Sequence, residues 1–104
     1  MTGKRTSDEA DSIPRFDVAI IGAGVSGAAI ARRLSAYELR VALLEKCVDV
    51  GFGVSKANSG IVHAGFHHGL DTLKARLEVR GNLMFEQLHH ELDFPFRRIG
   101  LLVV

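Results

Sequence analysis

A glycine-rich turn between an apolar run and a helical stretch is the feature that most limits how this chain can fold. The apolar residues 18–21 come first, and the turn Gly22-Ala23-Gly24-Val25-Ser26-Gly27 follows at once. Small and apolar residues with helical spacing occupy positions 28–34, and a second apolar run occupies 41–44. The order is typical of an α/β, Rossmann-like βαβ unit with parallel strands. It predicts a strand at 16–21, a helix at 26–37 and a strand at 40–45.

Each glycine of the turn has its own physical reason. Gly22 permits the backbone angles of a tight turn, Gly24 lets an anionic group approach the main chain, and Gly27 lets the helix pack on the strand. Amides at the helix start point at such a group, so an anion is held without Lys or Arg. Glu45 ends the second strand, where a carboxylate accepts hydrogen bonds from ribose hydroxyls. The pattern therefore predicts a dinucleotide site.

The same glycines also fit a plain strand-to-helix turn. Glycine makes up 11 of the 104 residues, so the spacing of three glycines is weak evidence for a binding site when taken alone. In this alternative, Glu45 is only a solvated charge at the end of a strand. The flanking strands, the small helix face and the acid together favour the binding site.

Composition limits the remaining possibilities. A chain of 104 residues has room for one modest domain, and a net charge of +1 without a basic cluster argues against binding nucleic acid. Cys47 is the only cysteine, so the expected location is a reducing cytoplasm. We expect its thiol to be a packed side chain, with a nucleophile as the alternative.

The N-terminal residues 1–14 are polar and mixed in charge, which predicts a disordered tail before a domain at 15–104. The tail lacks the apolar core of a secretory signal and the acid-poor composition of a transit peptide. No apolar run reaches membrane-spanning length.

The second half of the chain contains a long irregular segment and a helix. Residues 47–69 show no sustained period, and loops of this length are uncommon unless functional, so we expect cofactor contact, with a plain surface loop as the alternative. Thr72 is expected to cap a helix to about residue 92, with Leu73, Leu77, Met84 and Leu88 on its apolar face. Residues 101–104 favour a strand but have no partner.

The residues from about 16 to 104 resemble the N-terminal segment of FAD-dependent oxidoreductases of the D-amino-acid-oxidase-like superfamily. Beyond the glycine turn, the stretch Ser55-Lys56-Ala57-Asn58-Ser59-Gly60-Ile61-Val62-His63-Ala64-Gly65 looks like the branch with glycerol-3-phosphate dehydrogenases and L-2-hydroxyglutarate oxidases. The segment Thr72-Leu73-Lys74-Ala75 and the ending 92–100 fit that branch too.

The resemblance implies FAD as the cofactor and hydride transfer from a small hydroxy acid or polyol phosphate to the flavin. It places the turn on the pyrophosphate, Glu45 on the adenosine ribose, and His63 near the isoalloxazine ring as a catalytic proton acceptor or donor. His63 alternatively donates only to a loop carbonyl. A metal held by His63, His67 and His68 is not expected, since further ligands are absent. The implied cofactor-binding residues are Gly22, Ala23, Gly24, Val25, Ser26, Gly27, Glu45, Lys46, Ser55, Asn58, Ser59 and His63.

The chain departs from the family in length, because family members run to several hundred residues. We therefore expect an incomplete fold, the substrate domain being missing or supplied by other subunits, and membrane association is possible without a visible anchor. Two alternatives stay open: an NAD(H)-binding Rossmann module, and a non-catalytic remnant that binds nothing well or pairs its open sheet edge with another chain.

Overall fold

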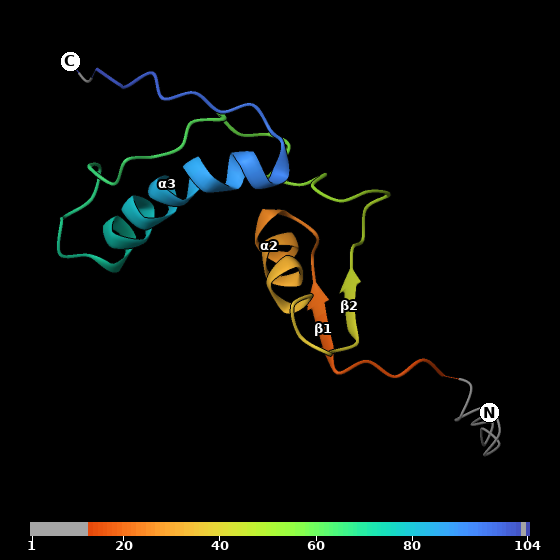
Figure 1. Ribbon diagram of the computed structural model, residues 1–104. Coiled ribbons are helices and arrows are strands. Elements are labelled where there is room, and N and C mark those ends of the chain that lie inside the picture. The colour runs from red at the N-terminus through yellow and green to blue at the C-terminus, as the bar shows by residue number, and fades with distance from the viewer. Residues whose placement is uncertain (1–12, 103) are drawn as a thin grey trace, which may run out of the picture. The chain divides into compact units, whose positions relative to one another are not determined.

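The computed structural model describes residues 13–102 and 104. The chain separates into two units, Met1–Ser59 and Gly60–Val104, and each is described by itself. Of the predicted tail, only Ile13 and Pro14 are among the described residues, and both are exposed. The described residues contain the strands β1 (Val18–Ile21) and β2 (Val41–Leu44) and the helices α2 (Val25–Leu34) and α3 (Leu73–Leu92), as Figure 1 shows.

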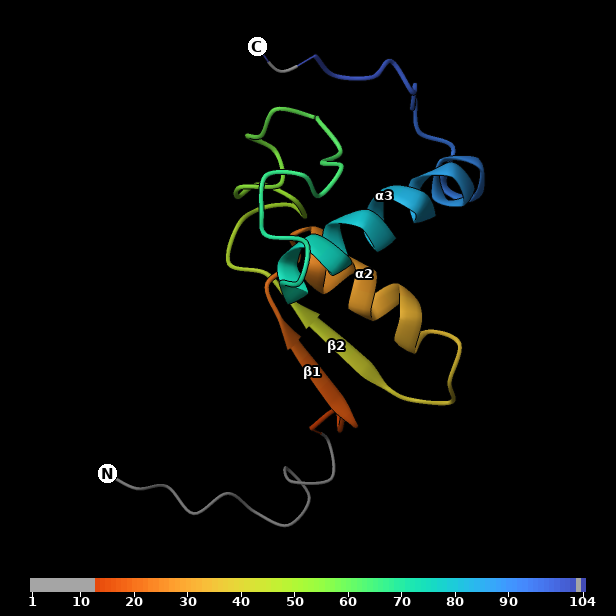
Figure 2. The ribbon, with the colours of Figure 1, turned by 90° about the vertical axis from the view of Figure 1, so that its left-hand side faces the viewer.

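The first unit is the predicted βαβ unit. Strands β1 and β2 pair in parallel with Val18 opposite Val41 and Ile21 opposite Leu44, and α2 connects them. The pairing extends beyond both strands, because the amide of Asp17 donates to the carbonyl of Arg40 and that of Gly22 to the carbonyl of Leu44. Figure 2 shows α2 running beside this two-stranded sheet. The parallel Rossmann-like arrangement predicted from the sequence is confirmed.

Helix α2 ends three residues before the predicted limit. Ser35 caps it, since its amide donates to Ala31 and its hydroxyl donates to the carbonyl of Arg32 at 2.7 Å. A serine that bonds back to the last turn competes with helix continuation. The first strand is only partly buried, although its residues 18–21 are all apolar. Within β1 only Ile20 is buried, and Ile21 is 88% exposed, because a two-stranded sheet covered by one helix leaves apolar surface open.

The second unit contains the predicted long helix. Thr72 caps α3 by accepting from the amide of Ala75 at 3.2 Å, and Asp93 ends it in the left-handed conformation. The loop before α3 packs on its first turns: a Cβ on Gly65 would lie 2.8 Å from Cγ2 of Val79. None of the helices in residues 13–102 is both long and apolar enough to cross a bilayer.

The face of α3 that contacts the rest of its unit is not the predicted one. Leu73, Leu77 and Met84 are each at least half exposed. The loop before α3 and the C-terminal segment 94–98 instead contact a stripe on the opposite side of the helix. That stripe runs through Ala75, Val79, Asn82, Phe85, Glu86 and His89. Residues 101, 102 and 104, whose sequence favours a strand without a partner, lie in no regular element.

Candidate dinucleotide-binding site

The corner between β1 and α2 is built by close approach of two glycines. Gly22 has a φ of 95°, a conformation that side chains disfavour. A Cβ on Gly27 would lie 1.9 Å from the carbonyl oxygen of Gly22 and 3.4 Å from the side chain of Ile20. The first turn of α2 therefore lies directly against the end of β1. The roles that the spacing predicted for Gly22 and Gly27 agree with this geometry.

The start of α2 presents backbone donors. Gly24 is the N-cap residue and has no side chain to satisfy them, and the first intrahelical hydrogen bond is from Ala28 to the Gly24 carbonyl at 2.9 Å. The amides before Ala28 thus have no intrahelical acceptor. No acid lies in the first turn, and Arg32 and Arg33 lie in the last, where they match the helix dipole. This end of the helix suits an anion.

Ser55 reaches the same helix end from 30 residues further along the chain. The Val25 amide donates to Oγ of Ser55 at 2.9 Å, and a Cβ on Gly24 would lie 3.2 Å from that oxygen. The carbonyl of Ala23 also accepts from the amide of Gly51 at 2.9 Å. The segment after β2 is therefore fastened to the glycine turn, which places a hydroxyl beside the proposed phosphate position.

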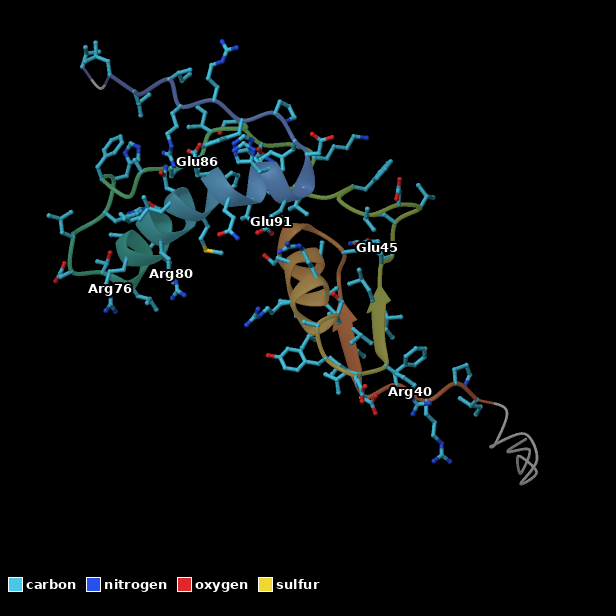
Figure 3. The ribbon with its side chains drawn as sticks, in the orientation of Figure 1. Arg40, Glu45, Arg76, Arg80, Glu86 and Glu91 are labelled. Carbon is cyan, nitrogen blue, oxygen red and sulfur yellow. The ribbon has the colours of Figure 1, made fainter. Side chains whose placement is uncertain are left out.

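Glu45 joins the glycine turn to the end of β2 (Figure 3). One carboxylate oxygen accepts from the Ala23 amide at 2.8 Å, and the other accepts from the Cys47 amide at 2.9 Å. The Cys47 amide, followed by that of Ala23, lowers the pKa of the Glu45 carboxyl below its ordinary value. A carboxylate has about four acceptor positions, so Glu45 retains acceptors for ribose hydroxyls.

The Glu45 contacts predict a pH effect on stability. A lowered carboxyl pKa stabilises the fold above the ordinary value of 4.5, and that contribution is lost as the pH falls through the folded-state pKa. Glu45→Gln should therefore lower the melting temperature at about pH 7 and show a smaller decline toward about pH 3 than the parent protein. Thermal unfolding at both pH values measures this, with Glu38→Gln, at an exposed position, as the control. An equal fall of the melting temperature in the parent protein and in Glu45→Gln would contradict this prediction.

The other predicted cofactor residues of the first unit lie in or beside the irregular segment. Asn58 holds a local turn, since its side-chain amide donates to the carbonyl of Ser55 at 2.8 Å. Lys46 and Ser59 are exposed. Their cofactor contacts stay predictions from the resemblance. Cys47 is exposed, so the expectation of a packed thiol is wrong, and the residue contributes its backbone amide, which donates to Glu45.

His63 belongs to the second unit. Its carbonyl accepts from the side chain of Asn82 at 3.2 Å, and its ring lies 5.7 Å from that of His67. His63 lines a pocket of about 490 Å³ that loop 60–67 and the C-terminal segment 95–101 form around Asn82. His68 pairs instead with Glu78, at 3.3 Å. Sequence reasoning missed Gly51 and the cap formed by Ser55, because hydrogen bonds between distant segments leave no periodic signal.

The chain belongs to the DAO family, described as FAD dependent oxidoreductase, which it matches over residues 17–104. It is 58% identical over 89 residues to a glycerol 3-phosphate dehydrogenase of Caloramator mitchellensis, a match that covers 86% of this chain and 18% of that protein. It is 40% identical to a glycerol 3-phosphate oxidase of Mycoplasma genitalium, with 86% and 23% covered. The mitochondrial L-2-hydroxyglutarate dehydrogenase of Arabidopsis thaliana is 39% identical, with 86% and 19% covered. The chain thus spans about a fifth of the length of these relatives.

Proposed function

We propose that the corner between β1 and α2 binds the pyrophosphate and adenosine ribose of FAD, and that the whole protein oxidises glycerol 3-phosphate or a small 2-hydroxy acid. The observation that carries the binding proposal is the joint geometry of the helix start and Glu45. The amides of Ser26 and Gly27 lie in the first turn of α2, before its first intrahelical hydrogen bond, and the N-cap residue Gly24 has no side chain to cover them. A carboxylate with spare acceptors lies at the end of the neighbouring strand. Family membership favours FAD over NAD(H) as the dinucleotide.

Each group of the corner has one task in this proposal. The first-turn amides of α2 hold the phosphates, and Gly24 leaves them open to approach. Ser55, whose Oγ lies on the Val25 amide, supplies a hydroxyl donor beside the phosphate. Glu45 accepts hydrogen bonds from the ribose hydroxyls while it keeps the glycine turn in place through Ala23. Lys46, Asn58 and Ser59 are assigned cofactor contacts by resemblance.

Flavin, when bound, supplies the hydride acceptor, and the protein orients the substrate and moves its proton. We assign the proton to His63, because a departing hydride at a carbon that bears a hydroxyl requires a base for the hydroxyl proton. An imidazole can accept that proton near neutral pH. The substrate classes come from the relatives, which are named for glycerol 3-phosphate and L-2-hydroxyglutarate.

The proposal is tested on the protein purified at its full genomic length. We expect a flavin absorption spectrum, either as purified or after addition of FAD, and bleaching under anaerobic conditions by glycerol 3-phosphate or L-2-hydroxyglutarate. Fluorescence titration with NADH tests the alternative that the protein binds NAD(H) in place of FAD. A colourless protein that ignores added FAD contradicts the proposed cofactor, and a flavoprotein that neither compound reduces contradicts the proposed substrates. Self-association without a ligand shift favours the non-catalytic alternative.

A further inference from the structure

The last two turns of α3 bring together three side chains with metal-binding atoms. Glu86, His89 and His90 each offer one such atom, and these atoms lie within 4.8 Å of one another. The spacing explains the cluster, because residues three and four positions after Glu86 are its neighbours on the helix surface. Figure 3 shows Glu86 on α3. Among the described residues this is the group with three candidate ligands, and it is separate from His63, His67 and His68.

Two of the three ligands are held in place. The guanidinium of Arg98 donates from Nε to Oε2 of Glu86 at 2.8 Å and from Nη1 to the side-chain oxygen of Asn82 at 3.0 Å. That contact lowers the pKa of the Glu86 carboxyl, so the group stays ionised. Arg98 occupies Oε2 only. The other oxygen, Oε1, faces Nε2 of His89 at 3.9 Å.

Aromatic packing fixes the His89 ring. Its side chain is 20% exposed, and its ring centroid lies 5.5 Å from that of Phe96 and 6.3 Å from that of Phe94. The ring of His90 lies beside it at 3.9 Å and is exposed to solvent. A packed imidazole, an oriented carboxylate and an accessible second imidazole form a partly preorganised set.

We propose that Glu86, His89 and His90 bind a divalent transition-metal ion of the zinc class. Two imidazoles and one carboxylate are a ligand set that Zn²⁺ accepts, with water completing the coordination. Ligands at about 2.0–2.2 Å from zinc lie about 3.4 Å apart in a tetrahedron, so modest side-chain rotations close the present separations. The hydrogen bond from Arg98 orients the carboxylate in the way that an outer-shell donor does. The site is independent of the proposed flavin function.

The positive charge of Arg98 opposes a cation, whereas the negative end of the α3 dipole favours one. His89 and His90 both lie in the last turn of α3, where the helix carbonyls carry that partial negative charge. The carboxylate is shared between guanidinium and metal, one oxygen each. We therefore expect a binding site of moderate affinity that is saturated by added metal rather than one that retains metal through purification.

Isothermal titration of the untagged full chain with zinc chloride tests the proposal. We expect one Zn²⁺ per chain, and His90→Ala should weaken that binding by about tenfold or more. His90 is exposed, so this variant should fold, and circular dichroism checks that it does. His67→Ala, which removes a histidine elsewhere in the same unit, is the matched control and should bind zinc as the parent does.

Two results would overturn the site. One is the absence of a stoichiometric zinc-binding step in the parent protein. The other is a His90→Ala variant that binds zinc as tightly as His67→Ala does. As a second measurement, zinc should raise the melting temperature of the parent and of His67→Ala but not of His90→Ala. Equal shifts in the three proteins would mean that the ion binds elsewhere.

Discussion

Gly27→Ala is expected to disrupt the corner between β1 and α2. The new methyl would lie 1.9 Å from the carbonyl oxygen of Gly22, a contact with backbone that no side-chain rotation relieves. Overpacking of a well-packed site costs typically 1–3 kcal/mol, and a backbone clash falls at or above the upper end, so we expect a loss of about 3 kcal/mol in the free energy of unfolding. Urea unfolding followed by circular dichroism measures the change.

Gly81→Ala is the matched control, because it makes the same substitution within a helix. A Cβ on Gly81 meets no atom within 4 Å, and alanine has the better helix propensity. We expect this variant to gain about 0.5–1 kcal/mol. A Gly27→Ala variant as stable as Gly81→Ala would show that α2 does not lie against Gly22 as described.

Gly24→Val is expected to weaken cofactor loading while the fold is largely retained. Gly24 has φ −72° and ψ −175°, an extended conformation that valine adopts readily. Its new Cβ would lie 3.2 Å from Oγ of Ser55, and its methyl groups would stand where the phosphates approach the α2 amides. We expect FAD affinity to fall by at least about tenfold, or about 1.4 kcal/mol of binding free energy.

The measurement for Gly24→Val is a fluorescence titration with FAD beside a thermal unfolding curve. Gly81→Val, a substitution of the same size outside the corner, should load FAD as the parent does. Undiminished loading by Gly24→Val would contradict the assignment of the phosphates to this helix start. The unfolding curve shows whether Gly24→Val fails to bind because it is unfolded. If it is unfolded, Ser55→Ala, which removes the hydroxyl that accepts from the Val25 amide, tests the same site.

Local patterns in the sequence were enough to predict the first unit. The apolar runs at 18–21 and 41–44 became β1 and β2 in parallel, and the spacing of Gly22 and Gly27 anticipated the close corner. The α3 helix was predicted to within a residue at both ends, because Thr72 caps its start. These features follow from periodicity, backbone freedom and capping, which act over a few residues.

The exposed strand surface shows where local reasoning fails. A continuous apolar run predicts burial on both faces, yet Ile21 is 88% exposed because burial depends on what covers the sheet. The same holds for α3, where Leu73 and Leu77 are exposed while Ala75 is buried. The hydrophobic pattern identifies a face that can be covered. The loop covers the face that carries Ala75 and Val79, where a Cβ on Gly65 would lie 2.8 Å from Cγ2 of Val79.

The helices and strands, their order, and the glycine turn with its acid at the end of β2 could all be predicted from the amino-acid sequence. Three contacts became visible in the folded chain alone: Ser55 accepts from the Val25 amide, Glu45 accepts from the Ala23 amide, and Arg98 orients Glu86 beside two histidines. The difference lies in how far apart along the chain the contacting residues are. Helix capping and the spacing of apolar residues involve near neighbours, whereas each of these contacts joins residues 12 to 30 positions apart through one or two hydrogen bonds that leave no trace in composition or period.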